Sequence, residues 1–147
     1  MAYKNASSTY KETKVKTAGQ GQLIVMLYDE AVKQLTKAAE LMDLNKTDKK
    51  DPGRIEQISK SIMKTEEILT ELMVSLNFDQ GGDISKNLFS LYTWFNRELV
   101  EANITQDTKR IRTVRDLIAD LKNAWSKVAS QGPVEQPGDS VGLNIAG

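Results

Sequence analysis

Apolar residues recur at steps of three and four in four separate segments of the chain, and turn-forming residues bound each segment. This spacing is typical of helices that bury one side, and no segment shows a convincing alternation with a period of two. The segments have similar lengths and short links, which favours antiparallel neighbours. The sequence therefore predicts an all-α fold, an antiparallel up-down four-helix bundle.

Residues that start or stop helices set the expected boundaries. The first helix is expected over residues 20–44, and Asp51 with the proline after it can cap the start of the second. The second helix is expected to end at Asn77, before a turn at residues 79–82. The third is expected to end at Asn103, because asparagine tolerates the left-handed conformation found at helix ends.

The chain has 147 residues, enough for one domain with one core. The bundle is expected over residues 20–130. Residues 1–19 show no sustained period and are expected to form a mobile N-terminal segment that caps a groove. Residues 131–147 are rich in glycine and small residues, so a flexible tail is expected there.

The residues needed for common catalytic and metal sites are missing. The chain contains no histidine and no cysteine, which removes the usual proton shuttle, nucleophile pairs and metal ligands. Carboxylates do recur at helical spacing, but a lysine or arginine lies close to each group, which indicates a solvated face with ion pairs. These carboxylates are Glu66, Glu67, Glu71, Asp116 and Asp120. No catalytic residue, metal ligand or cofactor is expected, and the protein is not expected to be an enzyme.

Charge and hydropathy limit the partners and the compartment. Lysine plus arginine equals aspartate plus glutamate, 20 against 20, so no overall positive field attracts a nucleic acid. No apolar stretch is long enough for membrane insertion, and the N-terminus lacks the apolar region of a signal peptide. The absence of cysteine fits a reducing compartment. A cytoplasmic protein is expected.

A helix in a bundle needs one row of apolar residues facing the core, which we call its stripe. Some apolar residues of this chain lie outside these stripes. In the third helix Phe89 and Val100 lie far from the expected stripe, with Tyr92 on its flank; that stripe is Ile84, Leu88, Leu91, Phe95, Leu99 and Ala102. In the second helix Met63 and Val74 lie away from the stripe, with Ile68 to one side. Two interpretations stay open. Either the termini or an extra helix of this chain cover these positions, or grooves there receive an amphipathic helix of another chain.

Three blocks of residues resemble the FliS family of flagellin export chaperones. The first is Tyr10 with Val15-Lys16-Thr17-Ala18 and the run from Leu23 to Ala31, the second runs from Gly81 to Tyr92 and on to Asn103, and the third is Trp125. Together they cover about residues 10–128 in the family's order. One departure is that Gly19-Gln20 stand where family members commonly have Ser-Pro, so the start of the first helix differs from the family pattern.

The resemblance implies a cytoplasmic chaperone of flagellar type III export. Such a chaperone binds the C-terminal helical region of flagellin, prevents premature polymerisation and, as a complex with flagellin, assists delivery to the export gate. We expect a monomer or a weak homodimer. An alternative is a self-associating structural or adaptor bundle. The expected partner-binding residues are Tyr10, Val15, Thr17, Ala18, Leu23, Met26, Leu27, Phe89, Tyr92 and Val100.

Overall fold

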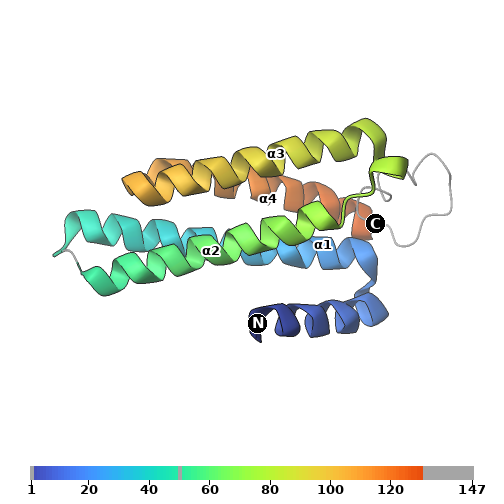
Figure 1. Cartoon of the computed structure of the whole chain (residues 1–147), viewed down its shortest axis with the longest axis horizontal. Coiled ribbons are helices and arrows are strands. Elements are labelled where there is room, and N and C mark those ends of the chain that lie inside the picture. The colour runs from blue at the N-terminus through green and yellow to red at the C-terminus, as the bar shows by residue number, and fades with distance from the viewer. Residues whose placement is uncertain (1, 50, 131–147) are drawn as a thin grey trace.

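The computed structural model describes the backbone of residues 2–49 and 51–130, and the side chains from Gln20 onward within those ranges. This part consists of four helices, namely α1 (Ala2–Thr47), α2 (Pro52–Val74), α3 (Phe78–Thr105) and α4 (Thr108–Ser130). Successive helices run in opposite directions (Figure 1). The predicted all-α, antiparallel four-helix bundle is therefore confirmed.

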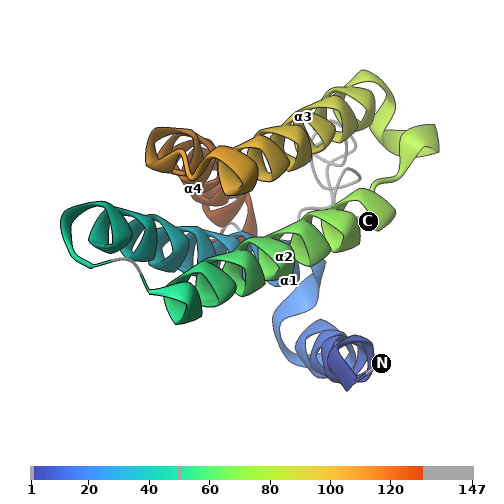
Figure 2. The ribbon, with the colours of Figure 1, turned by 60° about the vertical axis from the view of Figure 1, so that its left-hand side comes forward.

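Helix α1 begins much earlier than the apolar stripe indicated. Its helical backbone starts at Ala2, whereas the stripe begins near Gln20. In Figures 1 and 2 the first stretch of α1 is turned away from the bundle and lies outside the packing of the four helices. A stripe reports only the side of a helix that is buried, so it misses a helical stretch outside the core. The side chains of residues 2–19 and the tail at 131–147 lie outside the described residues, and the roles expected of both segments stay predictions.

The start of α2 follows the sequence prediction. Asp51 has an extended backbone and its Oδ1 accepts a hydrogen bond of 2.9 Å from the backbone N–H of Gly53. Pro52 occupies the first helical position, where its missing N–H costs nothing. Arg54 holds the preceding link by donating to the Lys49 carbonyl oxygen at 2.9 Å. Both ends of the link between α1 and α2 are therefore held by local hydrogen bonds.

The link between α2 and α3 differs from the prediction. Helix α2 ends at Val74, and Asn77 starts α3 by accepting a hydrogen bond of 3.0 Å from the Gln80 N–H. The expected turn at residues 79–82 is the first turn of α3, followed by a kink at Gly82, where φ is 53° and ψ is −127°. Glycine adopts this positive φ without a steric penalty. The chain therefore changes direction inside α3.

Helix α3 also ends later than expected. The residue with the left-handed conformation is Gln106, with φ 55° and ψ 46°, not Asn103. The Asn103 side chain instead accepts a hydrogen bond from Ser59 of α2 at 3.4 Å, so it is used between helices. Asp107 then caps α4 by accepting from the Arg110 N–H at 3.2 Å.

The core lies along the bundle axis and receives side chains from all four helices. Helix α1 packs most extensively, against α4 on one side and α2 on the other. Tyr28 of α1 and Tyr92 of α3 are buried at the centre, and their hydroxyl oxygens lie 2.5 Å apart in a hydrogen bond. Burial raises the pKa of both phenols, that of Tyr92 to about 12. The described helices include none both long and apolar enough to cross a lipid bilayer.

Candidate partner-binding face

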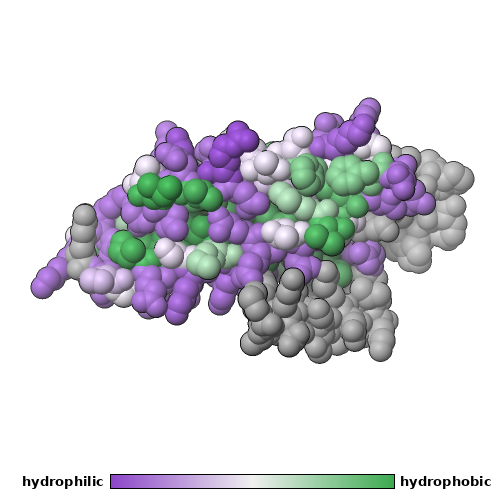
Figure 3. Space-filling model, in the orientation of Figure 1, coloured by the Kyte–Doolittle hydropathy of each residue, from purple (hydrophilic) through white to green (hydrophobic). Residues whose placement is uncertain are grey.

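The exposed large apolar side chains gather on one side of the bundle. Among the side chains that the structure describes, all of them except Leu44 belong to α2 or α3, and none belongs to α4. Those on α2 are Ile55, Met63 and Val74, and those on α3 are Phe78, Ile84, Phe89, Val100 and Ile104. Figure 3 shows hydrophobic groups over both helices, with hydrophilic residues between and around them. This side of the molecule is the candidate for contact with a partner.

One side-chain hydrogen bond joins α2 to α3 directly, because Ser59 of α2 donates to the Asn103 side chain of α3 at 3.4 Å. At the start of α3, Ser85 donates to the carbonyl oxygen of the capping residue Asn77 at 3.0 Å. We call the set Met63, Glu66, Phe89, Asn96 and Val100 the α2–α3 face.

The kink at Gly82 extends this apolar surface. It brings Phe78, at the start of α3, against Phe89, so that the ring centroids are 5.9 Å apart with an edge-to-face angle of 65°. This geometry is favourable for aromatic pairs. Both rings stay well exposed, Phe78 at 45% and Phe89 at 44%. The pair forms an apolar end to the α2–α3 face.

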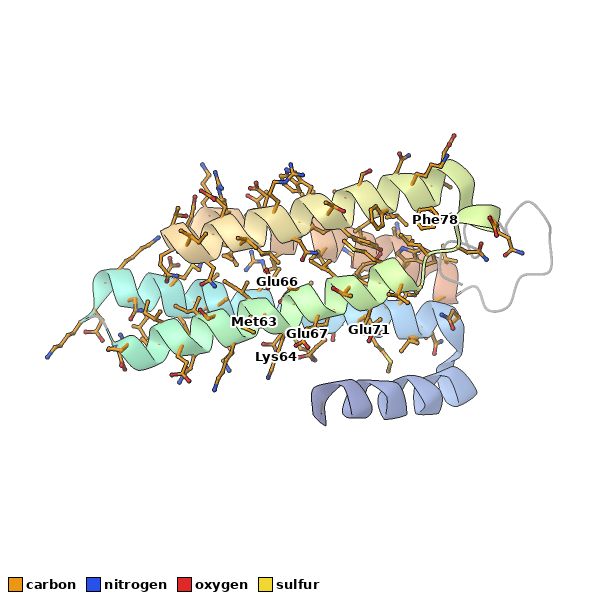
Figure 4. The ribbon with its side chains drawn as sticks, viewed as in Figure 1. Met63, Lys64, Glu66, Glu67, Glu71 and Phe78 are labelled. Atoms are coloured by element: carbon orange, nitrogen blue, oxygen red, sulfur yellow. The ribbon has the colours of Figure 1, made fainter. Side chains whose placement is uncertain are left out.

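Glu66 is a carboxylate among these apolar groups. Its side chain is partly buried, and burial raises its pKa above the ordinary value of a glutamate. Figure 4 shows Glu66 directed from α2 toward α3, whereas Lys64 and Glu67 lie on the opposite side of α2. Within the described part of the chain, no side chain forms an ion pair or hydrogen bond with the Glu66 carboxylate.

Asn96 presents a second acceptor without a donor. Its Oδ1 atom is buried and has no hydrogen-bond partner among the residues that the structure describes. Buried polar atoms are nearly always paired, so an unpaired one marks either a cost to folding or a missing partner. Glu66 on α2 and Asn96 on α3 therefore each carry an acceptor without a donor from the described residues.

The side formed by α1 and α4 is different, because its charges are paired across the helices. Lys122 of α4 lies 2.8 Å from Asp29 of α1, and Arg112 of α4 lies 2.6 Å from Asp43 of α1. Hydrogen bonds from these cations lower the pKa of both aspartates. On this side, two carboxylates of α1 are thus paired with cations of α4, unlike Glu66 of α2.

Of the predicted partner-binding residues, two lie exposed on the α2–α3 face. Phe89 is 44% and Val100 is 48% exposed, and Met26 of α1 is partly buried. Leu23, Leu27 and Tyr92 are buried. The side chains of the other four predicted residues lie outside the described part of the chain; they are Tyr10, Val15, Thr17 and Ala18. Partner contact stays a prediction for the whole set.

Three side chains lie elsewhere than the helical spacing indicated. Tyr92 was expected on the flank of α3 but is buried, because the core row of α3 follows Tyr92 and its hydroxyl is paired with Tyr28. Ile68 was expected beside the α2 stripe but is buried in the core. Ile84 was expected in the core but is 40% exposed, because the kink at Gly82 precedes it.

Sequence reasoning missed Glu66 and Asn96. Glu66 was assigned to a solvated, ion-paired face because Lys64 and other cations are near it in sequence. The signal that could have found it is its angular position, since Glu66 shares the side of α2 that carries Ser59 and Met73. Among the side chains of residues 20–49 and 51–130, no acidic cluster is placed to hold a metal ion.

Known proteins match this chain along nearly its whole length. The family model described as "FliS: Flagellar protein FliS" matches residues 3–132. The flagellar secretion chaperone FliS of Bacillus subtilis (strain 168) is 28% identical over 127 residues, which cover 86% of this chain and 88% of that protein.

Two further relatives are also flagellar secretion chaperones named FliS. The one from Escherichia coli (strain K12) is 30% identical over 116 residues, covering 79% of this chain and 80% of that protein. The one from Salmonella typhimurium (strain LT2) is 30% identical over 126 residues, covering 85% and 87%. Because these matches span the bundle and most of each relative, the resemblance of the sequence blocks is confirmed, and this chain belongs to the FliS family of flagellar proteins.

Proposed function

We propose that this protein is a cytoplasmic export chaperone that binds the C-terminal helical region of flagellin. It prevents premature polymerisation of flagellin and, as a complex with it, assists delivery to the flagellar export gate. The names of the relatives support a role in flagellar secretion. The observation that carries the proposal is the exposed apolar row on α2 and α3, above all Met63, Phe89 and Val100.

The physical argument concerns what such a row can bind. An amphipathic helix can place its apolar side against Met63 on α2 and Val100 on α3, as in helix-in-groove recognition. Each apolar side chain removed from water on both partners stabilises the complex. A segment whose apolar side is covered in this way is no longer available for contacts with other copies of itself.

The first stretch of the chain has a proposed role in the free protein. Residues 1–19 cover part of the apolar surface in the absence of flagellin and move away when it binds. Tyr10, Val15 and Ala18 are the proposed apolar contacts, whereas Thr17 lies within the helical backbone of α1 and is not proposed as a cap. This arrangement reconciles the two interpretations of the surplus apolar residues, because the same surface is covered first by this chain and then by the client.

The proposal is tested by titrating the protein with a purified C-terminal segment of flagellin and following heat release. We expect binding at micromolar or lower concentration, and delayed assembly of full-length flagellin at equimolar chaperone. A Val100→Asp variant is expected to lose at least tenfold in affinity, because binding would bury its carboxylate. The matched control is Asn123→Asp on the exposed side of α4. Absence of binding by the wild-type protein contradicts the proposal.

Self-association is the second candidate, because the same exposed row could bind another copy of the chain. Sedimentation distinguishes the two functions. A monomer, or a weak dimer that dissociates when the flagellin segment is added, supports the chaperone. A stable oligomer that excludes the segment supports a self-associating structural or adaptor protein.

A further inference from the structure

The end of the bundle where α2 leads into α3 combines exposed aromatic rings with a hollow. Residues 75–79 and Gln20 line this open hollow, whose volume is about 600 Å³. A hollow of this size can receive several side chains. Phe78 belongs to its lining and packs edge to face on Phe89, and both rings are exposed. The apolar end of the α2–α3 face is therefore open to an occupant.

The helical stretch at the start of α1 does not cover this end. In Figures 1 and 2 its backbone lies on the side of the bundle away from α3, whereas Phe78 and Phe89 both belong to α3. An occupant from this chain therefore has to come from another segment.

The last helix ends beside the hollow. Gly21 of α1 packs close to Ala129 of α4, because a Cβ atom on Gly21 would lie 3.6 Å from the Cβ of Ala129. Gln20, the neighbour of Gly21, lines the hollow. Figure 1 also shows the end of α4 at the same end of the bundle as the start of α3. The residues that follow Ser130 therefore leave the bundle next to the hollow.

The sequence after α4 is suited to an extended contact. Residues 131–147 contain two prolines and four glycines, which oppose a further helix. Within them Val141, Leu143 and Ile145 alternate with other residues, so an extended backbone directs all three to one side. The ten residues that precede Val141 can span about 30 Å. The alternating segment is therefore long enough and close enough to reach the rings.

We propose that residues 141–145 dock on Phe78 and Phe89 in the free protein and compete there with the client. Tethering makes a weak contact sufficient, because a short flexible linker gives an effective concentration of about 1 mM. A segment with a dissociation constant of about 1 mM as a free peptide is then docked about half of the time. The competition rests on the proposed function, whereas the docking does not.

This arrangement protects the apolar end of the face without closing it. In the docked state the two rings are shielded from apolar surfaces of other molecules. A client helix that reaches Phe89 has to displace only a weak contact, so the affinity that it loses is small. The segment thus acts as a replaceable cover at one end of the α2–α3 face.

The docking is tested with a spin label, because the chain contains no cysteine of its own. The Asn144→Cys variant carries a nitroxide on the side of the extended segment that faces away from the rings. Methyl-labelled isoleucines report on both ends of α3, since Ile84 and Ile104 lie about 30 Å apart along the helix. The label should reduce the Ile84 methyl signal at least twofold and leave the Ile104 signal nearly unchanged.

A flexible tether alone also brings the label near Ile84, so matched variants measure the docking itself. Replacing Val141, Leu143 and Ile145 with serine keeps the tether and should restore at least half of the lost Ile84 signal. Val134→Ser is the control, because this residue precedes the alternating segment, and it should restore nothing. An equal loss of signal with and without the three serines overturns the docking.

Two further measurements test the place of docking and its occupant. Phe89→Ala should restore the Ile84 signal as the three serines do, and an unchanged signal overturns docking on the rings. A second copy of the chain is the alternative occupant. It is tested by mixing spin-labelled chains with isotope-labelled chains that lack the nitroxide. A loss of Ile84 signal in this mixture as large as within one chain overturns the proposal.

Competition is measured by calorimetric titration with a C-terminal segment of flagellin. The three serines should raise the affinity about twofold, because the apparent dissociation constant is the intrinsic one divided by the uncovered fraction. If the wild-type protein does not bind flagellin, the proposed function fails, and the spin label still decides the docking. If the label shows docking but the serine variant binds flagellin with unchanged affinity, the competition is overturned while the chaperone function stands.

Discussion

Two pairs of polar side chains lie among apolar groups in this bundle, and they differ in whether they are satisfied. Tyr28 and Tyr92 lie in the core between α1 and α3, and each hydroxyl is paired with the other at 2.5 Å. Glu66 and Asn96 lie between α2 and α3, and their acceptors have no donor in the described residues. The first pair is satisfied inside the core, whereas Glu66 and Asn96 are left without a donor from the described residues.

Two aromatic residues of α3 show the same contrast. Phe95 is fully buried, whereas Phe89 is 44% exposed although it lies in the same helix. The helix therefore presents one side to its own core and another to a partner. Substitutions on the two sides should separate folding stability from client binding, and the predictions below use that separation.

The largest expected effect concerns these aromatic residues. Phe95→Ala should lower the free energy of unfolding by about 3–5 kcal/mol, because it leaves a cavity in the core. Phe89→Ala should lower it by less than about 1 kcal/mol, because the ring is already half in water. Urea denaturation measures both values. The comparison fails if Phe89→Ala is as destabilising as Phe95→Ala.

The next effect concerns the tyrosine pair. Tyr28→Phe should cost about 1–3 kcal/mol, because it leaves the Tyr92 hydroxyl buried without a partner. The double variant with Tyr92→Phe should recover most of that loss, since both polar groups are then replaced by apolar ones of similar shape. Thermal unfolding of the two single variants and the double variant measures the coupling. A purely additive loss would contradict the hydrogen bond as the main interaction.

A smaller effect is expected for the ion pair between Arg112 and Asp43. Both side chains are substantially exposed, so Arg112→Ala should cost no more than about 1 kcal/mol and less at high salt. The hydrogen bond from Arg112 lowers the pKa of Asp43. The stabilisation is therefore present above the ordinary aspartate pKa of about 3.9 and is lost as the pH falls through the lowered value. Unfolding midpoints at several pH values test this direction.

The smallest expected change is a gain in folding stability rather than a loss, and it concerns Glu66. Burial raises its pKa, so the ionised carboxylate destabilises the folded state at neutral pH, and this cost disappears as the pH falls through the raised pKa. Glu66→Gln should therefore raise the melting temperature of the free protein at pH 7 and have little effect near pH 4. Differential scanning calorimetry measures the shift, with Glu67→Gln as the control. A variant that is less stable at pH 7 would contradict the assignment of Glu66 as unpaired.

Helical spacing in the sequence was sufficient to predict the bundle and part of its outer surface. The start of α2 at Asp51 is as predicted, because a capping side chain followed by proline acts locally. The exposure of Phe89 and Val100 also follows the spacing, because both lie far around the helix from its core row. Features that depend on one helix alone could therefore be predicted from the sequence.

Features that depend on two helices could not. Tyr92 is paired with Tyr28 on another helix, and Glu66 is directed from α2 toward α3 (Figure 4). The kink at Gly82 placed Ile84 outside the core, and a periodic pattern cannot show such a change of direction. The candidate site was thus predicted through its apolar residues and missed through its polar ones.

The most direct test of partner contact at the α2–α3 face uses the methionine methyl groups as probes. Met63 is 58% exposed on this face, whereas Met42 is 1% exposed in the core. With ¹³C-labelled methionine methyl groups, a titration with the flagellin C-terminal segment should shift the Met63 resonance strongly and leave the Met42 resonance nearly unchanged. A Met63 resonance that does not move at saturating segment would contradict contact at this face.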